Sequence, residues 1–213
     1  MSPKKTALAV FVTAVLTTAS FADSPLTSTD FAEAYMDEPI AAAAGEANGV
    51  INERLMEYLA NEYNPFDVKM AVINKLGWQF SGRNNAKHFL DYLVKNHGYS
   101  NEKKFYKKGS ADELLSYAYL KAMDNYFEVD EALKYADRAV KKNKKSRTFQ
   151  LIAGLIRAQK TMDADWCEVY QITDRIRKNE RLMNDLRTRS VGIIYEYMDI
   201  YGDSCEGPGG STN

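Results

Sequence analysis

The placement of proline constrains the fold of this chain more than any other feature of its sequence. The chain has 213 residues and five prolines, at positions 3, 25, 39, 65 and 208. The 142 residues from Phe66 to Gly207 therefore contain none. Because proline costs about 3 kcal/mol inside a helix, a tract of this length without proline permits many helices in succession.

Apolar residues within this tract recur at helical spacing. The clearest stripes are Leu114, Leu115, Ala118, Tyr119 and Ala122, then Leu151, Ile152, Leu155, Ile156 and Gln159. Spacings of three and four residues place such side chains on one face of an α-helix. Runs that alternate apolar and polar residues are nearly absent. The sequence therefore predicts an all-α domain.

Capping signals give the expected helix bounds. Asn64 precedes Pro65 at a first helical position and opens a helix that ends near Gly77. Ser110 and Glu113 form a capping box, which opens a helix running to about Phe127. Further helices are expected from Asn84 or Asn85 to Gly98 and at 130–143, 147–161, 164–178 and 180–201. Ser28 to Glu38 is a weaker helix candidate, and Ala41 to Gly49 is ambiguous.

The first 22 residues have the pattern of a cleaved export signal. Lys4 and Lys5 are positive, Thr6 to Leu16 is apolar, and Ser20-Phe21-Ala22 has small residues where a signal peptidase needs them. The apolar run is shorter than the roughly 20 residues of a membrane span. We expect cleavage after Ala22 and a mature chain, without a membrane span, in a periplasm or outside the cell.

The mature chain suits a single domain. We expect a partly helical segment at 23–49, one α-helical domain at 50–205 and a disordered tail at 206–213. Removing Lys4 and Lys5 from the 28 basic residues leaves 26, against 29 acidic ones, a net charge of −3. That balance argues against binding to nucleic acid or to an anionic membrane. It leaves the oligomeric state open.

Cys167 and Cys205 are the only cysteines. An exported protein meets an oxidising environment, where paired cysteines form disulfides. If the helices at 164–178 and 180–201 form an antiparallel hairpin, the chain after Gly202 can fold back far enough to reach Cys167. We expect a structural disulfide, with two free thiols or pairing to another chain as the alternatives.

Residues 129–140 carry a more specific pattern. Ala132 and Ala139 are small and seven residues apart, which lets neighbouring helices approach closely, while Leu133 and Val140 fill the adjoining space. This segment resembles the second helix of a tetratricopeptide repeat, and the resemblance covers about residues 113–170. It implies stacked antiparallel helix pairs.

Compared with the repeat pattern, this segment shows one agreement and two departures. A step of 34 residues from Leu120 reaches Gly154, which suits the small position of a repeat. Leu120 itself is large, however, and Trp166 stands where the next unit has alanine. An irregular helical bundle is therefore the alternative architecture.

The resemblance also implies a binding surface. Stacked pairs leave one face lined by successive first helices. Tyr117, Lys121, Asp124 and Asn125 share the groove-facing stripe of the first helix, and we expect them to be accessible to solvent and to hold a peptide.

Two basic clusters flank expected helix ends. They are Lys103, Lys104, Lys107 and Lys108, then Lys141, Lys142, Lys144, Lys145 and Arg147. Cations near a helix C-terminus complement its dipole, so solvated turns account for both. The functional interpretation is a docking patch for an acidic protein or an anionic envelope polymer.

The sequence nominates no cofactor and no metal site. His88 and His97, the only histidines, lack the i, i+4 spacing of a helical metal pair. Glu57 beside Tyr58, and Glu196 between two tyrosines, are the candidates for the carboxylate of a glycan-cleaving enzyme.

The leading expectation is an exported, non-enzymatic α-helical protein that binds a protein or a peptide. The alternatives are a cell-wall glycan hydrolase that uses an isolated carboxylate, and a secreted inhibitor or immunity-type protein. The sequence favours a non-enzymatic role without excluding an enzyme.

Overall fold

The computed structural model describes residues 24–79 and 81–206. The expected export signal at 1–22, its cleavage site and the tail from 207 onward lie outside the described residues. Within them the chain forms ten α-helices and two short 3₁₀ helices, and no β-strand. The prediction of an all-α fold is confirmed.

The elements follow one another along the chain with short connections. They are η1 (Phe31–Tyr35), α1 (Pro39–Glu46), α2 (Glu53–Ala60), α3 (Phe66–Leu76), α4 (Asn85–Asn96), α5 (Glu102–Lys108), α6 (Ala111–Asp124), α7 (Asp130–Lys142), α8 (Arg147–Thr161), α9 (Trp166–Arg177), α10 (Thr188–Asp199) and η2 (Gly202–Cys205). The helices at 130–143, 147–161 and 164–178 thus form within two residues of their expected bounds. The sequence did not indicate α2 and α5.

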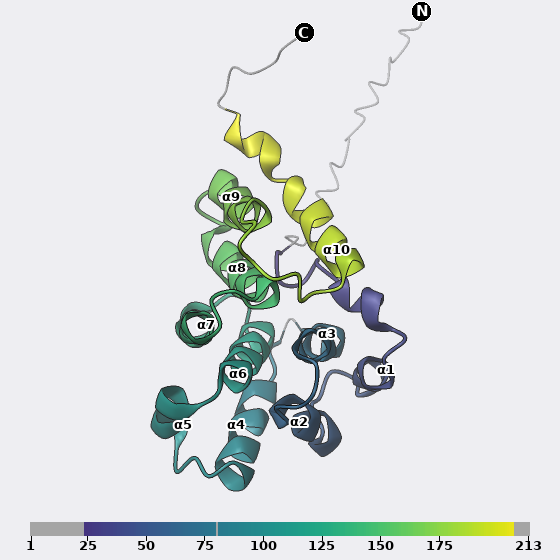
Figure 1. Cartoon of the computed structure of the whole chain (residues 1–213), viewed down its shortest axis with the longest axis vertical. Coiled ribbons are helices and arrows are strands. Elements are labelled where there is room, and N and C mark those ends of the chain that lie inside the picture. Colours follow the sequence, from purple (N-terminus) through teal and green to yellow (C-terminus); the bar gives the residue numbers. More distant parts are fainter. Residues whose placement is uncertain (1–23, 80, 207–213) are drawn as a thin grey trace, which may run out of the picture.

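Helix α6 lies at the centre of the fold. It packs against α2, α3, α4, α7 and α8, and Figure 1 shows it among these neighbours. Eleven of its 14 residues are buried, which is typical of a helix covered on all sides. The predicted capping box is present: Glu113 N donates to Ser110 Oγ, and Ser110 N donates to a Glu113 carboxylate oxygen. The helix ends at Asp124, before the expected Phe127, because Asn125 adopts an extended conformation.

The helices from α6 to α9 pack in successive pairs, α6 with α7, α7 with α8 and α8 with α9. Ala132 and Ala139 are fully buried, while Leu133 and Val140 are half-buried. A side chain on Gly154 would bring its Cβ within 2.9 Å of Ile176 Cδ1 in α9. Small residues therefore stand where neighbouring helices come closest, an arrangement compatible with a helical repeat.

The N-terminal segment packs into the same core as the rest of the domain. Phe31 and Tyr35 of η1 are fully buried, and η1 contacts both α3 and α10. Ser190 Oγ in α10 donates to the Phe31 carbonyl at 3.1 Å. Of the two uncertain segments, Ser28 to Glu38 holds only the 3₁₀ helix η1. The ambiguous one, Ala41 to Gly49, holds all but the first two residues of α1, which starts at Pro39.

The expectation of one long helix at 180–201 is wrong. Helix α10 begins only at Thr188, and the preceding residues run along the α7–α8 connection. Met183 N donates to the Lys145 carbonyl at 2.7 Å. Thr148 N donates to a carboxylate oxygen of Asp185 at 2.9 Å. These tertiary hydrogen bonds hold the segment in an irregular path that an α-helix would not allow.

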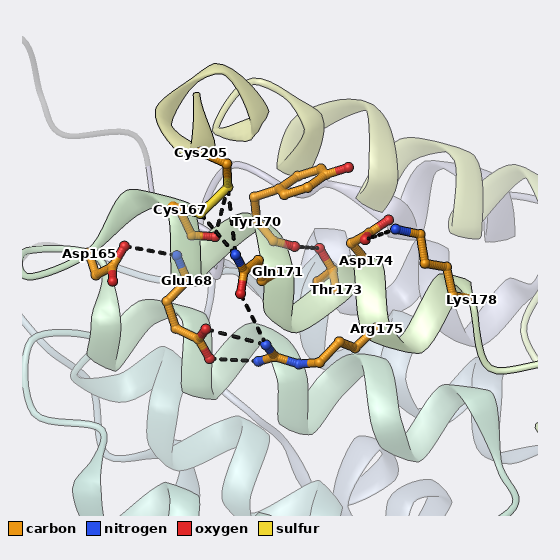
Figure 2. The surroundings of a disulfide bond; sticks show 10 residues. All are labelled: Asp165, Cys167, Glu168, Tyr170, Gln171, Thr173, Asp174, Arg175, Lys178 and Cys205. Carbon is orange, nitrogen blue, oxygen red and sulfur yellow. Dashed lines mark hydrogen bonds and ion pairs between the residues drawn. A yellow bond between two sulfur atoms is a disulfide. The ribbon is translucent and has the colours of Figure 1, made fainter. Parts of the chain in front are cut away.

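Cys167 and Cys205 are paired, as expected. Their Cα atoms lie 4.6 Å apart, and the bond joins the start of α9 to η2 (Figure 2). Gln171 points its side-chain amide at the pair, with Nε2 at 3.0 Å from Cys167 Sγ. The route differs from the expected hairpin, because the turn is a ten-residue irregular connection rather than a tight turn near Asn179. Among the described helices, none is both long and apolar enough to cross a membrane.

Candidate functional site

The four residues of the expected binding stripe lie together in the fold. Tyr117, Lys121, Asp124 and Asn125 line one depression of about 650 Å³, between α4, α6 and the start of α7. We refer to this depression as the α4–α6–α7 cleft. Their helical spacing brings them to one side of α6.

Two of the four are not accessible to solvent, contrary to expectation. Tyr117 is 3% exposed and Asp124 is 8% exposed, while Lys121 is half-buried and Asn125 is exposed. The stripe does not face an open groove, because α4, α5 and α7 lie against this part of the molecule. Tyr117 and Asp124 therefore form the floor and frame of the cleft.

Tyr117 belongs to a cluster of aromatic rings from three helices. Its ring centroid lies 5.5 Å from that of Phe105 in α5 and 4.6 Å from that of Tyr135 in α7. Both tyrosine hydroxyls donate to Glu102 Oε1, at 3.2 Å from Tyr117 and 2.8 Å from Tyr135. Burial raises the pKa of both hydroxyls, and the Glu102 carboxylate raises it further.

Asp124 holds the start of α4. Its two carboxylate oxygens accept from Asn85 N at 3.0 Å and from Ala86 N at 2.8 Å. Burial raises the pKa of this carboxyl group, and the two backbone hydrogen bonds oppose that shift. The carboxylate supplies the cap that Asn84, the N-cap residue, does not provide with its side chain.

Arg83 closes one end of the cleft. Its guanidinium donates to the carbonyl oxygens of Gly49 at 2.7 Å, Leu76 at 2.8 Å and Trp78 at 3.0 Å. Gly49 has a φ of 78°, and a Cβ there would overlap the guanidinium. Arg83 thus joins the α3–α4 connection to the N-terminal part of the chain.

The lining of the α4–α6–α7 cleft is acidic. The lining contains three cations, Arg83, Lys87 and Lys121. It also contains six carboxylates, those of Asp91, Glu102, Asp124, Glu128, Asp130 and Glu131. Three ion pairs involve these residues: Lys87–Asp91 at 2.6 Å, Lys121–Glu131 at 2.7 Å and Lys160–Asp130 at 2.6 Å. All the carboxylates except Asp124 belong to exposed residues. Complementary charge on a ligand would therefore be positive.

A second pocket, of about 540 Å³, brings together residues that lie far apart in the sequence, from Glu57 to Glu113. His97 Nδ1 lies 3.1 Å from Glu113 Oε1, while Tyr99 donates its hydroxyl to Glu113 Oε2 at 2.6 Å. Glu57 lines the same pocket. The capping box and the His97-Gly98 helix end are both visible in the sequence, but no local pattern predicts that they meet.

The predicted basic patch is exposed. Lys141, Lys142, Lys144 and Lys145 lie at the end of α7 and in the following turn, and none forms an ion pair within the described residues. Docking on this patch stays a prediction. The first basic cluster lies on the seven-residue helix α5, with Lys103 and Lys104 in its first half and Lys107 and Lys108 in its last turn, where their charge complements the helix dipole.

The two candidate catalytic carboxylates are both exposed to solvent, Glu57 on α2 and Glu196 on α10. A catalytic acid of a glycan hydrolase needs an enclosed surrounding that favours its protonated form, so neither position supports that alternative. His88 is exposed on α4. Among residues 24–79 and 81–206, no group of three or more His, Cys, Asp or Glu side chains is placed to hold a metal ion.

Comparisons with protein-family models, with curated proteins and with solved structures find no match to this chain. Functional inference therefore rests on the residues and their geometry.

Proposed function

We propose that this protein is an exported binding protein, not an enzyme, and that it holds a basic segment of a partner protein or peptide in the α4–α6–α7 cleft. The observation that carries the proposal is the lining of that cleft, where six carboxylates face three cations in a depression of about 650 Å³. Electrostatic complementarity gives such an interface its specificity and its association rate.

The carboxylates at the cleft are available to a ligand to different degrees. Glu128 is exposed and has no ion pair among the described residues. The pairs Lys87–Asp91 and Lys121–Glu131 lie at the surface, and pairs of this kind contribute about 0–1 kcal/mol. A lysine or arginine from a partner can replace such a contact at little cost.

The four residues of the stripe have two different roles in this proposal. Asn125 contacts the partner at the rim, because it is exposed, and Lys121 is the cation that the partner displaces from Glu131. Tyr117 and Asp124 hold the cleft in shape, through the ring cluster and the α4 cap. A rigid frame lowers the entropy cost of binding.

We further propose that α6 to α9 form a tetratricopeptide-like stack. The buried Ala132 and Ala139 and the close approach at Gly154 support this reading. Leu120, 1% exposed on α6, remains a departure from the pattern. Because the surface of α6 is covered by other helices, the cleft lies at the edge of the stack and not along an open inner face.

Charge reversal at Glu128 tests the binding proposal. The probe is a fluorescein-labelled peptide of alternating lysine and glycine, and the measurement is fluorescence anisotropy at low salt. Glu128→Lys should weaken binding about three- to tenfold, because it replaces an attraction with a repulsion. Glu180→Lys, an equal change at an exposed site outside the cleft, should leave binding unchanged. An equal loss in both variants would refute a site in the cleft.

The alternatives to this proposal make different predictions. Release of soluble fragments from cell walls by the purified protein, abolished by Glu57→Gln or Glu196→Gln, would replace it with a glycan hydrolase. Inhibition of a purified wall enzyme by both the wild type and Glu128→Lys would favour an inhibitor that acts through another surface.

Export is supported by the paired cysteines, because disulfides persist in oxidising compartments and are rare in reducing ones. We expect protein recovered from the exported fraction to begin at Asp23, as measured by intact mass. Cys167 and Cys205 should resist alkylation under denaturing, non-reducing conditions. Full-length protein retained inside the cell, with both cysteines labelled, would contradict export.

A further inference from the structure

The second pocket lies where several helices end. Its lining includes Ala60 and Asn61 at the end of α2, His97 at the end of α4, and Lys108 at the end of α5. It is about 540 Å³ in volume. We refer to it as the helix-end pocket, and it shares no lining residue with the α4–α6–α7 cleft.

Backbone electrostatics make the helix-end pocket attractive to a cation. The C-terminus of a helix carries a partial negative charge on its free carbonyl groups, and both α2 and α4 end here. The opposite effect would come from α6, whose N-cap residue Ser110 lines the pocket. That end is already neutralised, because Ser110 Oγ and the Glu113 carboxylate cap it reciprocally.

Side-chain charge acts in the same direction. Glu57, Glu62 and Glu113 line the pocket against a single permanent cation, Lys108. Glu113 is 5% exposed, accepts hydrogen bonds from Tyr99 and Ser110 and lies 3.1 Å from His97 Nδ1, so the carboxylates left for a ligand are Glu57 and Glu62, both exposed. The pKa of Tyr92 on the pocket wall is raised by its burial and then by the charges of Glu57 and Glu53.

Aromatic rings complete the lining. Tyr63, Tyr92 and Tyr99 all contribute to it. Tyr63 is 88% exposed, which is unusual for a large ring. Tyrosine rings attract ammonium and guanidinium groups through their quadrupole, and aromatic cages use this attraction to recognise such cations.

From the carboxylates, the helix ends and the rings that meet at this open pocket, we propose that the helix-end pocket binds an organic cation that carries an ammonium or guanidinium group. Glu57 and Glu62 supply the counter-charge, and Tyr63 and Tyr92 supply the ring faces. Tyr99 and Glu113, joined by a hydrogen bond, form the floor with His97 beside them. The site is independent of the cleft proposed above.

Three ligands that share one alkyl chain and differ in charge test this proposal. They are n-butylammonium chloride, butan-1-ol and sodium butyrate, added to the isotope-labelled mature chain and followed by two-dimensional ¹H–¹⁵N NMR. Butylammonium should cause saturable shift changes at Tyr63, Tyr92 and His97. Butan-1-ol should bind at least about threefold more weakly, and butyrate should not bind.

Variants identify the site. Glu57→Gln and Tyr63→Ala should each weaken butylammonium binding about two- to fivefold, and both sites are exposed, so the fold is retained. Glu180→Gln is the matched control and should have no effect. Glu128→Lys in the α4–α6–α7 cleft should also leave this binding intact. Equal binding of butan-1-ol, or shift changes confined to the cleft, would overturn the proposal.

Discussion

For Tyr117, a role in ligand contact and a role in the core predict opposite effects of side-chain truncation on stability. Its ring packs between Phe105 and Tyr135, and its hydroxyl donates to Glu102. A solvent-facing ring would tolerate truncation within about 0.5 kcal/mol. A ring that is 3% exposed leaves a cavity when it is removed.

We expect Tyr117→Ala to lower the free energy of unfolding by about 3–5 kcal/mol. Tyr117→Phe keeps the ring and loses only the hydroxyl contact, so we expect a loss of about 1 kcal/mol. Urea unfolding measures both. Tyr63→Ala removes the same atoms from an 88% exposed site and should change stability within about 0.5 kcal/mol. A Tyr117→Ala loss no larger than that of Tyr63→Ala would contradict the buried placement.

At the scale of helices, the sequence predicts the elements whose signals are local. The Ser110–Glu113 capping box and the apolar stripes at 111–124 and 147–161 are such signals. Helices α2 and α5 have eight and seven residues, too short to be stable in isolation, and packing of residues such as Phe105 stabilises them.

The same limit explains what the sequence misses at the sites. The side chains of the stripe from Tyr117 to Asn125 lie together because they have the spacing of a single α-helix. Its burial depends on neighbouring helices that no spacing within α6 reveals. The irregular segment before α10 is likewise held by Thr148 and Lys145, far away in sequence. The meeting of His97 with Glu113 is a tertiary contact of the same kind.

The disulfide belongs to the scale of elements because it joins η2 to α9 across 38 residues. A crosslink that closes a loop of this length stabilises by about 3–4 kcal/mol on the chain-entropy model. We expect the Cys167→Ser/Cys205→Ser variant to unfold at correspondingly lower urea, with the wild type under reducing conditions as a second test. A midpoint unchanged in both would show that the bond contributes nothing to stability.

Buried tyrosines are distributed through the whole molecule. Tyr35 in η1, Tyr117 and Tyr119 in α6, and Tyr135 in α7 are all at most 5% exposed. Burial raises the pKa of each hydroxyl above its ordinary value. Burial and the Glu38 charge also raise the pKa of Tyr58 to about 12. Raised tyrosine pKa values therefore make both the N-terminal segment and the central helices sensitive to high pH.

These shifts predict a loss of stability at high pH. In the unfolded chain a tyrosine titrates near pH 10, whereas in the folded chain the buried ones keep their protons to higher pH. The folded state then binds more protons above pH 10, so the free energy of unfolding falls as pH rises. Each such group changes the slope by up to about 1.4 kcal/mol per pH unit. Below pH 10 their contribution is complete and constant.

Because several buried tyrosines lower the stability together above pH 10, we expect the chain to unfold before their hydroxyls ionise in the folded state. We therefore expect the tyrosinate absorbance of the buried set to rise in one step, coincident with the loss of helical circular dichroism. Tyr135→Phe removes one titrating group and should make the loss of stability above pH 10 less steep. Tyr63→Phe, at an 88% exposed site, should leave the pH profile unchanged. Ionisation of every tyrosine while the helices remain intact would contradict the burial of these rings, because a buried tyrosinate without a counter-charge is not stable in a folded core.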